Sequence, residues 1–338
     1  MNISERARNL HFNSFVIDTH CDTLMKVCNS WNARTRKMNN LDAPYDLSKD
    51  YDSLHLNIPK MKTGGHNLQF FAVYLEPQYK PFGSLKRTLQ GFDAFYEMIE
   101  NNPEVMLVKS YEDALKAQKA NSLAGLLSIE GGEALEGDLS VLRMLYKLGL
   151  RCIGLTWNQR NRIAEGVGDC VSGGGLTVFG RELIKEMNRL GVIVDVSHLS
   201  EPGFWDVIKY SSKSIIASHS NAKAVCDHAR NLTDEQIKAL AKNGGVMGMN
   251  FCRAFVKSGD TVTIEHMLDH IDHIINLVGP NHIGIGSDFD GIAAAPDGLE
   301  NVTKFPNLTE GLIRRGHSDE TIKKLLGENY LRVMKNTL

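Results

Sequence analysis

Short apolar runs rich in β-branched or aromatic residues recur along the chain and alternate with segments of helical spacing. Between the runs, Leu85, Leu89, Phe92 and Tyr96 repeat at helical spacing, and the stretch 233–236 carries a helix start signal. The predicted strands are 14–18, 68–75, 123–130, 151–157, 191–197, 214–218, 244–251 and 282–287. Strands that alternate with crossover helices are typical of a parallel sheet, and these predict an α/β fold, a (β/α)8 TIM barrel.

The same pattern bears on domain organisation. Because no repeat, low-complexity tract or flexible linker divides residues 1–338, we predict a single (β/α)8 barrel domain. The polar, irregular region from about 31 to 66 is too long for an ordinary connection and is expected to form a lid or rim. A helical segment is expected over about 309–338, where Ser318 supplies a helix start.

Composition excludes several classes of protein. Hydrophobic residues make up 42% and charged residues 23% of the chain, the balance of a globular protein with a sizeable core. The 38 basic and 40 acidic residues nearly cancel without a long basic run, so a nucleic-acid partner is not expected. No apolar run approaches the roughly 18 to 20 residues that span a bilayer, and the N-terminal segment lacks an apolar signal core. We therefore expect no membrane association and a cytoplasmic protein, with its six cysteines reduced.

Candidate chemistry lies where the predicted strands end. His20 and Asp22 come at i and i+2 near the end of the first strand, so both side chains can point to one side of the barrel mouth. This pair alone is a weak signal. It is strengthened by residues that end or follow later strands, since all strands of such a barrel open onto the same face. These residues are Glu130, His198, His219 and Asp288.

Imidazoles and carboxylates together suit a divalent ion such as zinc, although manganese, cobalt or iron would accept the same ligands. A carboxylate between two ions can bridge them, and Glu130 is the candidate for this role. Paired metals about 4 Å apart can share and ionise a water, so a metal-bridging hydroxide is the expected nucleophile. The alternative is that these residues only cap strands, but burying so many titratable groups without a metal would be costly.

Two further residues are candidates for handling the substrate. Asp288, in GIGSDFDG, could complete a metal shell or shuttle a proton to a leaving amine, and we favour the proton role. Nearby Asp290 is interpreted as a support for the loop. Arg230 follows the sixth strand and could clamp a substrate carboxylate; from position alone, an ordinary surface arginine is an equal alternative.

These motifs together resemble the membrane (renal) dipeptidase family, a branch of the metal-dependent amidohydrolase superfamily. The resemblance runs from about residue 14 to near the end, and its motifs occur in the family's order. They are VIDTHCDTL (16–24), SIEGGEAL (128–135), GLTVFGRELIKEMNRLGVIVDVSH (175–198), IIASHSNAKAV (215–225), HARNLTDEQ (228–236) and IGIGSDFDG (283–291).

The resemblance implies two zinc ions on a TIM barrel, with Glu130 between them. It further implies that His20 and Asp22 hold one ion and that His198 and His219 hold the other. Asp288 would then act as acid and base, and Arg230 would receive the carboxylate of a dipeptide. The family also implies tolerance of D-residues at the C-terminal position, and its members are often dimers, which leaves a homodimer as an expectation.

One position departs from the family pattern. A His follows Leu-Thr after the fourth strand in well-known members, whereas this chain has Trp157 and then Asn158. An indole donates one hydrogen bond and cannot become cationic, so the metals, Asn158 or another group would stabilise the transition state. The substrate range is therefore open at this point, with Trp157 and Asn158 as candidate substrate-binding residues.

The sequence predicts a metal-dependent dipeptidase, and two alternatives stay open. The first is hydrolysis of another amide, lactam, lactone or ester on the same metals. The second is a binding protein without turnover. Such a protein would lack a metal ligand or the proton carrier, and the motifs contain all of these residues.

Overall fold

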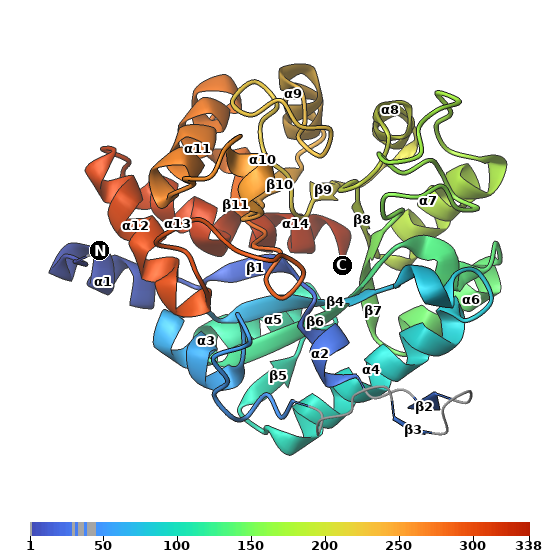
Figure 1. Cartoon of the computed structure of the whole chain (residues 1–338), viewed down its shortest axis with the longest axis horizontal. Coiled ribbons are helices and arrows are strands. Elements are labelled where there is room, and N and C mark those ends of the chain that lie inside the picture. Colours follow the sequence, from blue (N-terminus) through green and yellow to red (C-terminus); the bar gives the residue numbers. More distant parts are fainter. Residues whose placement is uncertain (1, 29–30, 33–36, 39–44) are drawn as a thin grey trace.

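The computed structural model describes residues 2–28, 31–32, 37–38 and 45–338. Eight parallel strands form a closed barrel in the order β4-β1-β11-β10-β9-β8-β7-β6, which closes because β4 also pairs with β6 (Figure 1). Their bounds are β1 Ile17–Cys21, β4 Leu68–Tyr74, β6 Leu123–Glu130, β7 Leu150–Gly154, β8 Ile193–Asp195, β9 Ile216–Ala217, β10 Val246–Met249 and β11 Ile283–Ile285. The predicted (β/α)8 barrel is confirmed.

Helices lie around the barrel, most of them in the crossovers between successive strands, with α1 before the first strand and α12 to α14 after the last (Figure 1). Their bounds are α1 Glu5–Phe12, α2 Thr23–Val27, α3 Ile58–Gly64, α4 Ser84–Asn101, α5 Tyr111–Ala120, α6 Leu139–Lys147, α7 Val178–Leu190, α8 Glu201–Tyr210, α9 Asp234–Lys242, α10 Arg253–Val256, α11 Ile264–Val278, α12 Phe305–Arg314, α13 Asp319–Lys323 and α14 Asn329–Thr337. Short 3-10 turns (Pro77–Tyr79, Gly132–Leu135, Pro280–His282, Val302–Lys304) and one π-helical turn (Lys324–Glu328) complete the set.

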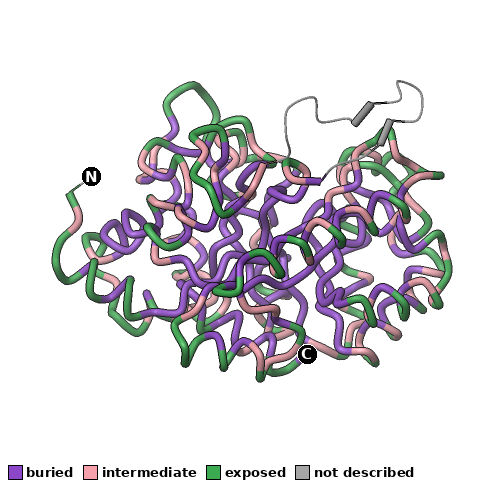
Figure 2. The backbone as a smooth tube through the Cα atoms, turned by 90° about the horizontal axis from the view of Figure 1, so that it is seen from below, coloured by how far each residue is buried: buried purple, intermediate pink, exposed green. Residues whose placement is uncertain are grey.

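The barrel strands are buried on both faces, which explains their near-continuous apolar runs. Along β4, Leu68 and Phe70 belong to a cluster packed with α14, whereas Phe71 and Val73 belong to the layer between the barrel and its helices. In Figure 2 buried residues run through the centre and exposed residues lie on the outer helices and loops. The core therefore consists of two apolar clusters, which take residues from opposite faces of β4.

Several helix starts were predicted from local signals, and the structure confirms them. Thr233 caps α9 in a capping box with Gln236, and Ser200 caps α8, which has Pro202 in its first turn. Ser318 caps α13, and the predicted helical end of the chain consists of α12 to α14. Side-chain oxygens at these positions accept bonds from backbone N–H groups that no helix can satisfy internally.

Most strand limits differ from the sequence prediction, and most of the observed strands are shorter than the predicted ones. The first strand is Ile17–Cys21 rather than 14–18, and the sixth is Ile216–Ala217 rather than 214–218. An additional strand, β5 (Val105–Leu107), pairs with the first residues of β6 outside the closed ring. Burial extends beyond the paired residues, as at Phe15 and Val16. An apolar run can therefore be longer than the strand it contains, or be shifted from it along the chain.

The expected lid or rim at 31–66 falls partly outside the described residues, which omit 29–30, 33–36 and 39–44. Trp31–Asn32 and Lys37–Met38 form the two-stranded sheet β2–β3. From residue 45 onward the segment packs on the barrel, with Leu47, Leu54 and Leu56 buried, and leads into α3. A lid function stays a prediction.

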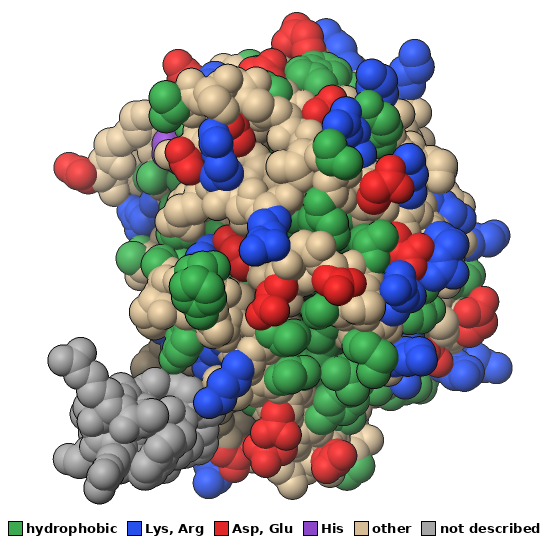
Figure 3. Space-filling model, turned by 90° about the vertical axis from the view of Figure 1, so that its right-hand side faces the viewer, with side chains coloured by type: hydrophobic (Ala, Val, Ile, Leu, Met, Phe, Trp, Pro, Cys, Tyr) green, Lys and Arg blue, Asp and Glu red, His purple; other side chains and the backbone are tan. Residues whose placement is uncertain are grey.

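The surface carries both signs of charge. Figure 3 shows the side of the molecule on which α6 and α7 lie. Lys and Arg side chains are interspersed there with Asp and Glu, and hydrophobic side chains also reach the surface. Met144 and Leu148 of the α6 region are among the exposed hydrophobic residues. No helix within the described ranges has the length and apolar character that crossing a bilayer requires.

Candidate active site

The six candidate residues converge at the carboxyl ends of the barrel strands. Five of them are at least nine-tenths buried, and Asp288 is partly exposed. His20 lies in β1, Glu130 ends β6, and the others follow β1, β8, β9 and β11; these are Asp22, His198, His219 and Asp288. The structure thus brings together all the residues that the strand ends predicted.

The route by which Asp22 reaches the site differs from the expected one. The register of β1 shifts between Asp18 and Cys21, and Asp22 stands at the N-cap position of α2 with φ −101° and ψ 19°, outside strand geometry. Its Oδ2 nevertheless lies 3.7 Å from Nε2 of His20. The two side chains therefore meet at a strand-to-helix turn, and the alternation of a regular strand is not what aligns them.

Glu130 occupies the centre of the group. Its Oε1 lies 2.9 Å from Nε2 of His198 and 3.4 Å from Nε2 of His219, whereas its Oε2 lies 3.7 Å from Nε2 of His20. Two sets of metal-ligating atoms share this carboxylate, namely Glu130 with His198 and His219, and Glu130 with His20 and Asp22. Each oxygen of Glu130 faces a different set.

Hydrogen bonds fix which nitrogen of two imidazoles faces the centre. Nδ1 of His198 lies 2.8 Å from Oδ1 of Asn158, which can only accept, so Nδ1 carries the hydrogen. Nδ1 of His219 lies 2.7 Å from Oγ of Ser218, and that hydroxyl donates to Oδ2 of Asp195 at 2.5 Å. Nδ1 of His219 must therefore donate as well.

Both Nε2 atoms then present lone pairs, and they lie 3.0 Å apart. Two lone pairs at this distance repel unless a cation lies between or beside them. Nε2 of His20 and Oδ1 of Asp22 are also buried without a hydrogen-bond partner among the described residues. This set of nitrogen and oxygen donors fits divalent metal ions.

The protonation states of the buried histidines and carboxylates also favour a bound cation at this site. Burial lowers the pKa of His198 and of His219 well below the usual range, so both imidazoles are neutral and free to ligate. Burial also disfavours the charged form of His20, but the carboxylates of Glu130, Asp22 and Asp288 outweigh it and raise its pKa to about 10. In the absence of metal a proton on His20 is thus the charge that balances the carboxylates, and a divalent ion can replace it.

The group opens into a cavity of about 300 Å³ that Arg230 also lines. Arg230 is 6% exposed, donates from Nη2 to the backbone oxygen of His219 at 3.1 Å, and lies 5.6 Å from the ring centroid of Phe255. Its Nε has no hydrogen-bond partner among the described residues. A buried guanidinium that lines a cavity and has an unpaired N–H is suited to bind a carboxylate.

Comparison with known proteins agrees with this geometry. Residues 4–338 match the family model described as Membrane dipeptidase (Peptidase family M19). The chain belongs to the membrane dipeptidase family. It is accordingly a metal-dependent dipeptidase, a hydrolase of peptide bonds.

Relatives resemble this dipeptidase over nearly its whole length. An uncharacterized dipeptidase of Schizosaccharomyces pombe is 35% identical over 352 residues, which cover 98% of this chain and 83% of the relative. The structure of a metallopeptidase named dipeptidase AC has a TM-score of 0.87 at 29% identity, covering 96% of this chain and 99% of that one. A Rhodobacter sphaeroides metallopeptidase, liganded with a phosphinate mimic of L-Ala-D-Ala, has a TM-score of 0.85 at 29% identity, covering 96% and 100%.

Three contributors to the dipeptidase site were missed from the sequence. Tyr74 ends β4 and lines the cavity, so the rule that selected Glu130 would have found it. Asp195 and Ser218 precede the two histidines in the motifs, but their link to an imidazole is visible only in three dimensions. Trp157 and Asn158 both line the cavity as predicted candidates, and Oδ1 of Asn158 is the group that orients His198.

Asp290 was interpreted as a support for the loop, and its contacts agree. Its Oδ1 accepts from the backbone N–H of His55 at 2.8 Å, and its Oδ2 accepts from Oγ1 of Thr23 at 2.6 Å. The backbone N–H of Asp290 donates to Nδ1 of His55 at 2.9 Å. The loop that carries Asp288 is thereby fixed to α2 and to the segment before α3.

Backbone conformation adds a further constraint. His198, Asp288 and Asp290 have φ values of 66°, 63° and 64°. Non-glycine residues rarely adopt this left-handed region, which costs about 1–3 kcal/mol for each residue. The site therefore holds three residues in strained geometry, and two of them face the proposed metal centre.

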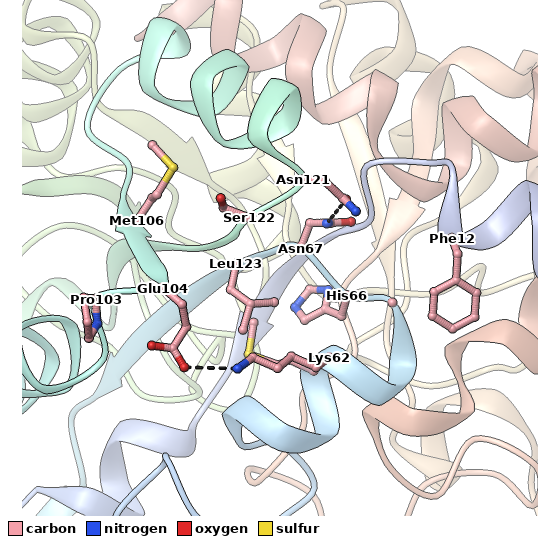
Figure 4. Close-up of a pocket in the computed structure, with 12 residues that line it drawn as sticks. Phe12, Lys62, His66, Asn67, Pro103, Glu104, Met106, Asn121, Ser122 and Leu123 are labelled. Carbon is pink, nitrogen blue, oxygen red and sulfur yellow. Dashed lines mark hydrogen bonds and ion pairs between the residues drawn. The ribbon is translucent and has the colours of Figure 1, made fainter.

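A larger cavity, of about 550 Å³, lies at the opposite end of the barrel, where β4 and β6 begin (Figure 4). It contains the ion pair of Lys62 with Glu104 and the hydrogen bond between Asn67 and Asn121. The metal-ligating clusters found among the described residues all lie at the other end of the barrel. Size alone therefore does not mark the catalytic cavity.

We predict that Asp195→Asn weakens metal binding. The amide presents an N–H where Ser218 now donates, which disturbs the hydrogen bond that holds His219. Loss of such an outer partner typically lowers metal affinity about 10- to 100-fold. Titration against a chelating dye measures the affinity, with Asp319→Asn, an exposed partner of Arg6, as the matched control. Unchanged affinity in Asp195→Asn would contradict the prediction.

Proposed function

We propose that this dipeptidase uses two divalent ions, both zinc, with Glu130 as the bridging ligand. His20 and Asp22 complete the ligands of one ion, and His198 and His219 those of the other. The observation that carries the proposal is the placement of the two Glu130 oxygens, each facing a different set of ligating atoms. Mixed imidazole and carboxylate ligands suit zinc.

When bound, such a pair of ions supplies Lewis acidity at the scissile carbonyl and lowers the pKa of a water. Arg230 binds the free C-terminal carboxylate through its N–H groups and sets the position of the peptide bond. A third residue beyond that carboxylate would collide with the buried guanidinium, so the substrates are dipeptides. The volume of about 300 Å³ agrees with a substrate of this size.

Asp288 carries the proton to the departing amine. Its Oδ2 accepts from Nδ2 of Asn250 at 3.0 Å, and its Oδ1 lies 3.9 Å from Nε2 of His20, at the edge of the metal centre. Burial raises the pKa of Asp288 to about 7; His20 opposes the rise, and the carboxylates of Asp22 and Glu130 add to it. A carboxyl group beside the metal centre, with one oxygen held by an amide, is suited to general acid and base catalysis.

The ligand of a relative supports a proposal about the stereochemistry of the C-terminal residue of the substrate. Because the Rhodobacter metallopeptidase binds a mimic of L-Ala-D-Ala, we propose that the C-terminal position here also accepts D-residues. The cytoplasmic location and the homodimer stay predictions, which cell fractionation and light scattering would test.

The test is a substrate panel with metal-depleted and zinc-reconstituted protein. L,L- and L,D-dipeptides should be cleaved only after reconstitution, with two equivalents of zinc per chain by elemental analysis. Tripeptides and N-acyl amino acids should remain intact. Cleavage of another amide, lactam, lactone or ester in place of dipeptides would overturn the substrate assignment, and one equivalent of metal at full activity would overturn the bridged pair.

A further inference from the structure

Two aromatic side chains line the catalytic cavity and meet at an angle. Tyr74 ends β4 and Trp157 follows β7, and their ring centroids lie 5.2 Å apart with an interplanar angle of 65°. Both residues are partly exposed. We call this pair the aromatic corner. It offers the faces and edges of two rings to whatever enters the cavity.

The strand order places Tyr74 across the barrel from Arg230, and it places Trp157 after β7, two strands from β9. Arg230 follows β9, and β4 is four strands from β9 in either direction around the ring. Trp157 and Tyr74 also flank Glu130, because β6 lies between β4 and β7. Any ligand that reaches from Arg230 across the metal centre therefore arrives at the aromatic corner.

The direction of a bound dipeptide follows, and this step rests on the proposed function. With the C-terminal carboxylate at Arg230 and the peptide bond at Glu130, the C-terminal residue lies on the side of Cys252 and Phe255. The N-terminal residue must extend to the other side of Glu130. Its side chain then meets the rings of Tyr74 and Trp157.

The charge of the cavity wall restricts which side chain fits there. Apart from Arg230 and the groups of the metal centre, the lining residues are uncharged. A charged side chain would lose hydration there without gaining a partner, whereas an apolar or aromatic one would bury surface against the rings.

The nearby charge of Lys80 is already balanced. Its Nζ lies 5.5 Å from the ring centroid of Trp157 and 2.9 Å from Oε1 of Glu133. The side chains of Lys80 and Glu133 are 13% and 8% exposed, and neither residue lines the cavity. This ion pair supports the indole and leaves no free charge to select an acidic or basic substrate.

We propose that Trp157 and Tyr74 form the subsite for the N-terminal side chain, and that the preferred substrates are dipeptides with an apolar or aromatic N-terminal residue. Trp157 is thus a specificity-determining residue. The indole that departs from the family pattern acts by packing on the substrate, and no charge on it is required.

The experiment compares kcat/KM of the zinc-reconstituted full chain on X-D-Ala dipeptides, with Gly, Ala, Leu, Phe, Lys and Glu at X. Leu and Phe should exceed Gly by about tenfold or more, since added apolar groups in a hydrophobic pocket commonly gain that much. Lys and Glu should fall below Leu and Phe by at least the same factor. In Trp157→Ala the ratio of Phe to Gly should approach one, whatever the overall activity.

Two further variants keep the result interpretable. Tyr74→Ala should reduce the same ratio and serves if Trp157→Ala does not fold. Trp205→Ala is the matched control, because Trp205 lies on α8, is 38% exposed and does not line the cavity. Its ratio should equal that of the unaltered protein.

The outcomes separate the two proposals. If no X-D-Ala or L,L-dipeptide is cleaved, the proposed function fails. If dipeptides are cleaved but Lys and Glu match Leu and Phe, the subsite is overturned while the dipeptidase stands. A Phe to Gly ratio that survives in both Trp157→Ala and Tyr74→Ala would also overturn the subsite.

Discussion

Glu130→Gln is expected to lose both metal ions and to reduce dipeptide turnover by roughly three orders of magnitude or more. The neutral amide cannot supply two negative oxygens to two sets of ligands, and metal ions contribute several kcal/mol of transition-state stabilisation. In the structure each oxygen of Glu130 faces one set, so a single substitution affects both. Elemental analysis and kcat/KM on one dipeptide measure the two effects.

A matched Glu→Gln change separates this loss from a general effect. Glu186 lies on α7, where it pairs with Arg143 and Arg189 away from the cavity. Glu186→Gln should keep both its metal content and its turnover. If Glu130→Gln retained two equivalents of metal, the bridging role would be wrong even if activity fell.

Arg230→Ala is expected to lower kcat/KM for dipeptides by about 30-fold to several thousandfold. Removing one partner of a buried, charged hydrogen-bonded pair costs roughly 2–5 kcal/mol, because the substrate carboxylate then enters the cavity without a counter-charge. Burial lowers the pKa of this guanidinium, but the surrounding carboxylates oppose that shift, so the side chain stays charged at neutral pH. Steady-state kinetics on L-Ala-D-Ala measure the effect.

The substrate itself provides the control for Arg230. A dipeptide amide lacks the C-terminal carboxylate and should be a poor substrate for the unaltered protein. Its kcat/KM should change little between that protein and Arg230→Ala. An equal loss on the acid and the amide would show that Arg230 acts on the structure of the site and does not clamp the carboxylate. Arg143→Ala, on the exposed face of α6, is the matched surface change.

The barrel could be predicted from the sequence because strands buried on both faces leave long apolar runs, and eight of these alternate with helical segments. Strand limits could not, since a residue such as Val16 is buried but its backbone bonds go to Asn67 and Leu68 at the strand entrance. The strand β5 could not either. Its three residues form a signal too short to separate from a loop.

The proposed ligands could be predicted because one geometric rule, polar residues at the ends of parallel strands, selects them all. The groups that orient them follow no such rule. Asp195 reaches His219 through Ser218, across the pairing of β8 with β9, and Asn158 reaches His198 from the loop after β7. These contacts depend on the register between strands and on loop paths, which the pattern of apolar residues does not encode.

The left-handed residues of the site bear on how this enzyme would respond to laboratory evolution. Selection for thermal stability alone would favour glycine at His198 and Asp288, since glycine adopts their φ values without strain. The same exchanges would remove a proposed ligand and the proton carrier. Stability and activity therefore oppose each other at these two positions, and a thermostable variant that keeps its activity must gain its stability elsewhere in the barrel.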